Sequence, residues 1–213
     1  MVSVAMLAAG AGSLASGPVL LAAVERTTST VVASGAWRRR AVAAALSATT
    51  AALSWAGWVR LGATPIWPAW CWACALGCGL ALTDLRCRRL PFSLVATLAG
   101  GGATLLFAVT VVDGSWSRYG LACLAAVAVY CLASLVQFWA PEHTGGGDTA
   151  LYAALALFLG WFGWDGLVQG LVIASGLTAV VALVVLVTSK SVNSRFPAGP
   201  SLIAGALLGI LWG

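Results

Sequence analysis

Two aspartates have the type and the placement that acid–base chemistry requires. Asp84 ends an apolar stretch in LALTDLRCRRLPFSL, and Asp148 begins another in GGGDTALY. Carboxyl groups beside long apolar runs are costly to ionise, and such residues by default mark function. If the two carboxyl groups share one proton, their pKa values separate. One can then act as a general base on water, while the other protonates the carbonyl oxygen or the leaving nitrogen of an amide.

Other interpretations of the same two residues stay open. Asp148 can be an N-cap whose carboxylate accepts hydrogen bonds from the first N–H groups of a helix. Asp84 can be a solvated helix-end acid beside the arginines of its own stretch, although a helix C-terminus is an unfavourable place for a negative charge. A small transporter could use both as proton or cation ligands. That function would favour inverted repeats and broken helices, and the sequence contains neither.

Three glycines, Gly145, Gly146 and Gly147, directly precede Asp148. Because glycine lacks a Cβ atom, a substrate backbone can approach the loop closely and the loop can adopt positive φ values. The single histidine, His143, lies in the same loop and is interpreted as a loop residue, since the sequence offers it no nucleophile as a partner. The remaining acids are predicted in loops and short outer turns, where water is available: Glu25, Glu142, Asp113 and Asp165.

The cysteines and the known sequence motifs exclude several classes of site. Cys71, Cys74 and Cys78 are spaced as one face of a helix, which favours helix packing over a zinc site, because zinc prefers two pairs of ligands in loops. We therefore predict no metal and no cofactor. The sequence also has no G-x-S-x-G, H-E-x-x-H or phosphate-binding loop, so serine hydrolases, zinc peptidases and nucleotide-driven pumps lack their signatures.

The elements that position these residues are predicted to be membrane helices. Of the 213 residues, 61% are hydrophobic and only 8% are charged, whereas a soluble domain carries about a quarter charged residues. The apolar runs are continuous and do not alternate, which excludes a membrane barrel. We expect an all-α, polytopic membrane helix bundle of about eight transmembrane helices, or seven. The predicted segments are 2–24, 41–59, 66–83, 92–112, 118–140, 149–164, 166–188 and 198–213.

Charge placement predicts the orientation. With the N-terminus outside, nine of the eleven basic residues fall in inside loops and two, Arg60 and Arg118, fall outside. Tryptophans cluster near the predicted outer ends, as in an interfacial belt. Asp84 and Asp148 then both lie on the inner side. The basic charge is thus a topology signal, and no nucleic-acid partner is predicted. The inside residues are Arg26, Arg38, Arg39, Arg40, Arg86, Arg88, Arg89, Lys190 and Arg195.

The chain is interpreted as one membrane bundle in two parts. Residues 1–65 are expected to hold two N-terminal transmembrane helices joined by a short basic inside loop, and residues 66–213 a six-helix unit with both aspartates. The first helix is predicted to be uncleaved, because the basic cluster WRRR follows it instead of preceding it.

Three motifs resemble those of the type IV prepilin peptidases, which are membrane aspartic proteases with a G-x-G-D motif. The stretch DLRCRRLP, from Asp84 to Pro91, matches the first motif of that family. GGGD, ending at Asp148, matches the second, although Ala150 stands where the family usually has lysine. FPAGPSLIAG, residues 196–205, is similar to the third. The motifs occur in the family's order, each at a predicted helix boundary.

The resemblance implies an aspartic endopeptidase of the bacterial cytoplasmic membrane, serving type IV pilus assembly or protein secretion. It implies that Asp84 and Asp148 are catalytic and that Gly145, Gly146, Gly147 and Pro91 form the substrate loop. The partner would be a prepilin or pseudopilin helix, whose short basic leader is removed at the cytoplasmic face. The loop 25–40 is too short for the methyltransferase domain of many relatives, so no S-adenosylmethionine is expected. A catalytically inactive relative remains the alternative.

Overall fold

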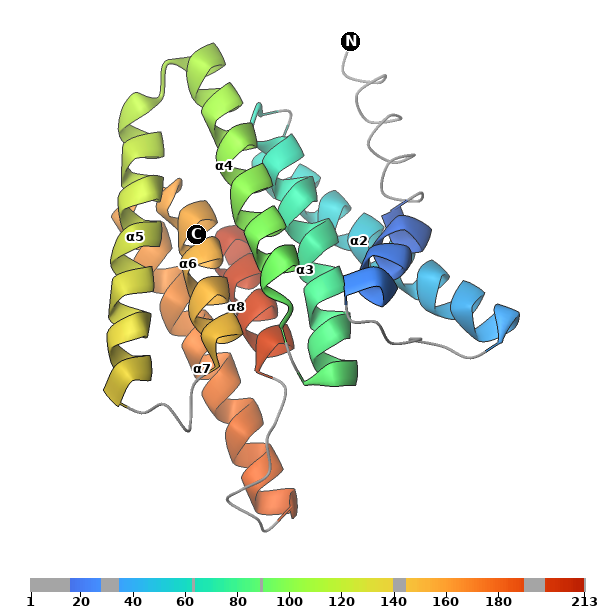
Figure 1. Ribbon diagram of the computed structural model, residues 1–213. Helices are drawn as coiled ribbons and strands as arrows, with labels where there is room; N and C mark the ends of the chain where they lie inside the picture. The colour runs from blue at the N-terminus through green and yellow to red at the C-terminus, as the bar shows by residue number, and fades with distance from the viewer. Residues whose placement is uncertain are drawn as a thin grey trace.

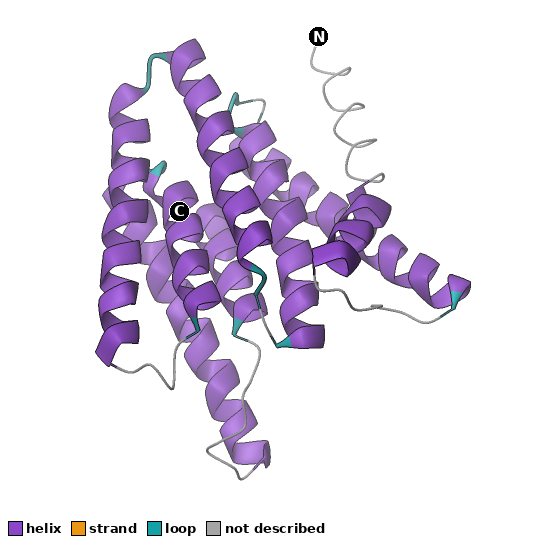
Figure 2. Cartoon of the chain, viewed as in Figure 1, coloured by secondary structure: helices purple, strands orange, loops and turns teal. Residues whose placement is uncertain are grey.

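The computed structural model describes residues 16–27, 35–62, 64–88, 90–139, 145–189 and 198–212. Across these ranges the chain forms eight helices and no strand, which confirms the all-α prediction. Figure 2 shows the helices and the loops that join them. The first helix covers residues 16–27. The others are α2 (Ala36–Leu61), α3 (Trp67–Cys87), α4 (Phe92–Asp113), α5 (Trp116–Trp139), α6 (Gly146–Gly160), α7 (Gly163–Ser189) and α8 (Gly199–Trp212).

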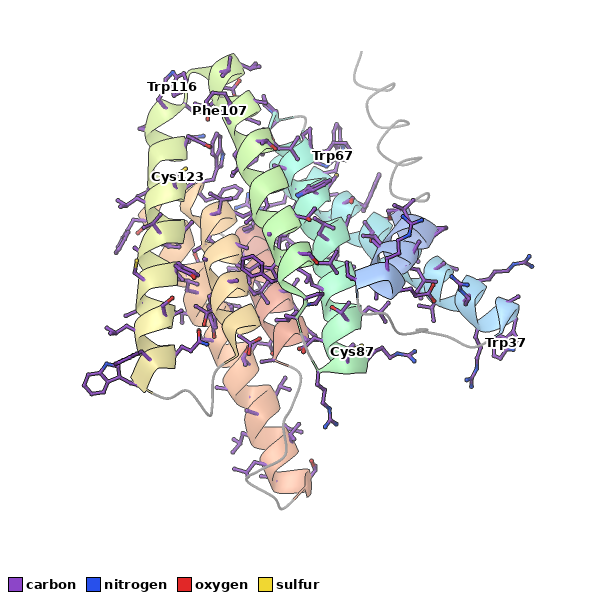
Figure 3. All side chains as sticks on the ribbon, in the orientation of Figure 1. Trp37, Trp67, Cys87, Phe107, Trp116 and Cys123 are labelled. Carbon is purple, nitrogen blue, oxygen red and sulfur yellow. The ribbon has the colours of Figure 1, made fainter. Side chains whose placement is uncertain are left out.

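Four helices, α2, α4, α5 and α7, are long and apolar enough to cross a membrane, which indicates a multi-pass membrane protein. The helices α6 and α8 are shorter and are also apolar. Figure 3 places Trp67 and Trp116 at the end of the bundle opposite Cys87, the last residue of α3. The aromatic end and the Asp84 end of the bundle are therefore distinct.

The two short helices form the centre of the bundle. Most residues of α6 and α8 are buried, whereas few residues of α5 and α7 are. The longer helices α4, α5 and α7 pack around α6, and α3 and α7 pack against α8. In Figure 1, α6 and α8 begin at the same end of the bundle at which α3 terminates. Three helix ends can thus bring their residues together there.

Two tryptophans of α3 pack against the neighbouring helices α2 and α4. The Trp70 indole covers Gly57 of α2, and its Nε1 donates to the Leu53 carbonyl oxygen at 3.0 Å. Trp72 covers Gly101 of α4 in the same way. A Cβ atom on either glycine would lie 2.4 Å or less from an indole atom, so only glycine lets these rings lie against the neighbouring backbone. These contacts hold α3, and with it Asp84, between α2 and α4.

Several predicted residues lie outside the described ranges, among them Arg89, Glu142, His143, Lys190 and Arg195. Of the three cysteines on the face of α3, Cys74 is fully buried and the other two are partly buried. Across the described residues, no group of three or more His, Cys, Asp or Glu side chains could hold a metal ion.

Candidate active site

The C-terminal turn of α3 holds Asp84 in a buried position. Its side chain is only 5% exposed, and its Oδ2 accepts a hydrogen bond from the Gly199 backbone N–H at 2.7 Å. Gly199 is the first residue of α8, so this N–H has no carbonyl partner within its own helix. The carboxyl group therefore caps α8 from a different helix. Its unfavourable position at the C-terminus of α3 is offset by the positive end of the α8 dipole.

Glycine is required at position 199 by this close approach. A Cβ atom there would lie 2.8 Å from Asp84 Oδ2 and 3.3 Å from both Cβ and Cγ of Asp84. No such contact is compatible with the 2.7 Å hydrogen bond unless α8 or Asp84 shifts. Two residues further along, Ser201 Oγ lies 2.9 Å from Thr178 Oγ1, which links the start of α8 to α7.

The chain leaves the helical conformation at Arg88, directly after the end of α3. The Arg88 backbone N–H donates to the Asp84 carbonyl oxygen at 2.8 Å, and Arg88 adopts the left-handed conformation with φ 49°. A left-handed residue commonly ends a helix, and a non-glycine residue there costs roughly 1 kcal/mol. This turn sends the chain back toward α6, so that Leu90 contacts Gly147. Pro91 then serves as the N-cap of α4, where its carbonyl oxygen accepts from Leu94 and Val95.

Asp148 lies in the first turn of α6. Gly145 is the N-cap, and Asp148, three residues on, accepts a backbone hydrogen bond from it. This is one half of a capping box. Asp148 occupies the third helical position, so the interpretation of Asp148 as the N-cap residue is wrong. Unlike Asp84, Asp148 is only partly buried.

Burial raises the pKa values of both acids, and the charge of Asp84 also acts on Asp148. Asp84 follows the apolar segment 66–83 and Asp148 precedes the segment 149–164, so both carboxyl groups lie at the ends of apolar segments. Burial raises the pKa of the Asp84 carboxyl, and the Gly199 hydrogen bond partly opposes that rise. Burial also raises the pKa of Asp148, and the negative charge of Asp84 raises it further. The pair can therefore hold a proton that an isolated aspartate would lose.

The glycines before Asp148 differ in their surroundings. A Cβ atom on Gly147 would lie 2.8 Å from both the Cβ and the carbonyl oxygen of Leu90, whereas one on Gly145 or Gly146 would make only ordinary contacts at 3.7 Å. None of the three has a positive φ. These three glycines therefore do not use the positive φ values that the sequence analysis allowed the loop. Glycine is needed at position 147, because there the first turn of α6 touches the chain that follows α3.

Two residues near the acids were not predicted from the sequence to act there. Gly199 bonds Asp84 across 115 residues, and its only sequence signal was the third motif, which carried no assigned role. Gln137, near the end of α5, accepts a hydrogen bond from Thr149 beside Asp148. The sequence signal for Gln137 is weak, since it rests on the rarity of glutamine in this chain and on its place in a mostly apolar helix. Tyr152, a further polar residue, lies one turn after Asp148 in α6.

Comparison with protein families identifies one match. The model of the type IV leader peptidase family matches residues 69–188. This segment covers more than half of the chain and includes Asp84, the turn through Pro91 and the glycines before Asp148, but it ends before Gly199. No curated protein and no solved structure matches the chain.

Proposed function

Because the chain belongs to the type IV leader peptidase family, we propose that it is a membrane aspartic endopeptidase acting through Asp84 and Asp148. The observation that carries this proposal is that Asp84 at the C-terminal end of α3 and Asp148 in the first turn of α6 lie at the same end of the bundle (Figure 1). The pKa values of both are raised, and that of Asp148 is raised partly by Asp84. A pair that retains one proton between two carboxyl groups can supply an acid and a base at the same time.

The reaction follows from this shared proton. The ionised carboxylate removes a proton from a water molecule as the water oxygen attacks the scissile carbonyl carbon. The protonated partner gives its proton to the carbonyl oxygen, and a tetrahedral diol forms. A proton then passes from the pair to the amide nitrogen, the C–N bond breaks, and the products are a carboxylic acid and an amine. Because the acids titrate as a pair, neither residue alone is assigned as the base.

The proposed substrate is a prepilin-like protein with a short basic leader and a hydrophobic helix after the scissile bond. The family supports this class of substrate, and the basic residues predicted on the inner side support cleavage at the cytoplasmic face. The segment between the first two helices is short, which supports a peptidase without methyltransferase activity. We therefore expect mature products with an unmethylated N-terminus.

Co-expression tests the proposal. The wild-type chain is produced with a prepilin-like substrate from its own organism, and leader removal is followed by gel shift and mass spectrometry. We expect Asp84→Asn and Asp148→Asn each to lower the cleavage rate by about 10²- to 10⁴-fold, the usual contribution of a general acid or base. Asp113→Asn and Asp165→Asn are matched controls, because both acids are exposed at helix ends away from the pair.

The outcomes separate three functions. If the precursor stays intact although the wild-type protein is folded and inserted in the membrane, the protein is a catalytically inactive member of the family. Normal cleavage by either asparagine variant would reject the assigned pair while sparing the family assignment. Proton or cation transport by the wild type in vesicles, lost in both asparagine variants, would favour a transporter.

A further inference from the structure

The first turn of α6 is held on two sides. On one side Gly147 lies against Leu90, the residue that follows the turn after α3. On another side the Thr149 hydroxyl donates to Gln137 Oε1 of α5 at 2.8 Å. Asp148 lies between these two contacts in sequence and projects from the same turn. Its direction therefore depends on how this turn is rotated about the α6 axis.

Gln137 is suited to set that rotation. Its Oε1 accepts from Thr149, while its Nε2 would lie 3.7 Å from a Cβ atom built on Gly146, so the amide group spans the first turn of α6. Thr149 is only 5% exposed, and its hydroxyl is otherwise near only the Gly145 carbonyl oxygen, at 3.5 Å. The Gln137 bond is thus the main hydrogen bond of a buried hydroxyl, and such a bond is costly to lose.

We propose that Gln137 is a positioning residue that aims the Asp148 carboxyl group toward Asp84 through the Gln137–Thr149 hydrogen bond. This inference rests on the proposed function, because it concerns the same pair of acids. Gln137 does not touch the reacting atoms. Its effect passes through Thr149 to the adjacent Asp148, and it sets how strongly the charge of Asp84 acts on that carboxyl group.

Four variants test this proposal. Gln137→Met keeps the length of the side chain but cannot accept the bond, and Thr149→Val keeps the shape of threonine without its hydroxyl. Thr149→Ser restores a hydroxyl. The matched control is Gln169→Met, which replaces the other glutamine of the chain, on the helix α7 far from the acids in sequence. Thermal unfolding of each purified variant in detergent reports its folding.

Two measurements are made on each variant. The first is the kcat and KM for cleavage of a prepilin-like substrate. The second is the pH midpoint at which dicyclohexylcarbodiimide, which reacts with protonated carboxyl groups, labels the Asp148 peptide in mass spectrometry. The labelling needs no substrate and no turnover. It therefore tests the position of Asp148 even in a protein that cleaves nothing.

We expect Gln137→Met and Thr149→Val each to lower kcat by about 10- to 100-fold with little change in KM, since a misplaced catalytic group costs on this order. Both should shift the labelling midpoint of Asp148 in the same direction. The double variant should be no worse than either single variant, because both remove one bond. Thr149→Ser should recover activity relative to Thr149→Val, and Gln169→Met should match the wild type.

Three results would overturn the proposal. The first is a folded Gln137→Met variant with wild-type kcat and an unchanged labelling midpoint. The second is a double variant whose loss is the product of the single losses, since that means independent roles. The third is a labelling midpoint of Asp148 that shifts as far in Gln169→Met as in Gln137→Met. If the wild type cleaves no substrate, the proposed function fails alone, and the labelling midpoints still decide whether Gln137 positions Asp148.

Discussion

The surroundings of Asp84 and those of Asp148 are built in opposite ways. Asp84 is buried at the C-terminus of one helix, and its hydrogen bond comes from Gly199, 115 residues away. Asp148 is partly buried at the N-terminus of another helix, and its hydrogen bond comes from Gly145, three residues before it. One carboxyl group is held by tertiary structure and the other by its own helix.

The positions of the two carboxyl groups therefore depend on different contacts. Because Asp84 is fixed only when α3 and α8 are packed together, its environment reports on the assembled bundle. The local geometry of Asp148 can form with α6 alone, but its approach to Asp84 depends on contacts with Leu90 and Gln137. Substitutions around Asp84 should therefore lower the cleavage rate more than substitutions around Asp148.

Gly199→Ala should have the largest effect. The added Cβ atom would lie 2.8 Å from Asp84 Oδ2, so the carboxyl group must move and lose its bond to the backbone N–H. We expect the cleavage rate to fall by about 100-fold. Since that bond lowers the pKa of Asp84, its loss should raise this pKa and move the acidic limb of the pH–rate profile upward.

The control for that experiment is Gly100→Ala in α4, where a Cβ atom would meet nothing within 4 Å. This variant should cleave like the wild type and be slightly more stable, because alanine favours a helix over glycine. Wild-type activity in Gly199→Ala would mean that the Gly199 hydrogen bond does not hold Asp84 in place.

Gly147→Ala should have the next largest effect, with a loss of about 10-fold. Its Cβ atom would lie 2.8 Å from two atoms of Leu90, and one of these is a backbone oxygen that cannot rotate away. The first turn of α6 must therefore move away from the segment after α3, and Asp148 moves with it. Gly145→Ala should lower the cleavage rate much less, since its Cβ atom would make only an ordinary contact at 3.7 Å. Equal losses in both variants would contradict this explanation.

The difference between the acids also explains what the sequence could predict. The residues from Gly145 to Asp148 form a local signal, so the position of Asp148 at a helix start was predictable. The partner of Asp84 was not, since no local pattern indicates a contact across 115 residues. The helices themselves were predictable because continuous apolar runs must form them in lipid. The structure places α4 at Phe92–Asp113, against the predicted 92–112.

The central position of α6 and α8 could not be predicted from hydropathy. A helix that faces lipid and one that faces other helices are both apolar, so the same composition serves either position. Only close packing at small residues distinguishes them, as where Gly205 of α8 lies against the backbone at Ala174 of α7. Such a contact needs both partners to be known, and they are distant in the sequence.

Asp84→Asn should lower the pKa of Asp148. The negative charge of Asp84 raises that pKa, and asparagine removes the charge with little change in shape. The pH midpoint of carbodiimide labelling at Asp148 should therefore fall relative to the wild type. Because coupling between titrating groups is reciprocal, Asp148→Asn should lower the pKa of Asp84 as well. An unchanged midpoint would show that the two acids titrate independently and would remove the basis for a shared proton.

The smallest expected effect is on stability. The pKa of each acid is higher in the folded protein than its usual value of 3.8, so folding favours the protonated forms. Their stabilising contribution is complete below the pKa of the unfolded chain and is lost as the pH rises through the folded pKa. At neutral pH Asp148→Asn should therefore unfold at a higher temperature than the wild type, since the cost of a buried charge is gone. Each kcal/mol corresponds to about 2–4 °C in a chain of this size.

Thermal unfolding in detergent between pH 4 and pH 8 measures this difference. The increase in unfolding temperature of Asp148→Asn over the wild type should become smaller toward low pH, where the wild-type acid is already protonated. Asp113→Asn, which replaces an exposed acid, should show no such dependence on pH. A gain that instead grows toward low pH would mean that the folded protein favours the ionised form of Asp148. The gain at neutral pH would also make the acids costly to the fold, as expected of residues retained for chemistry and not for stability.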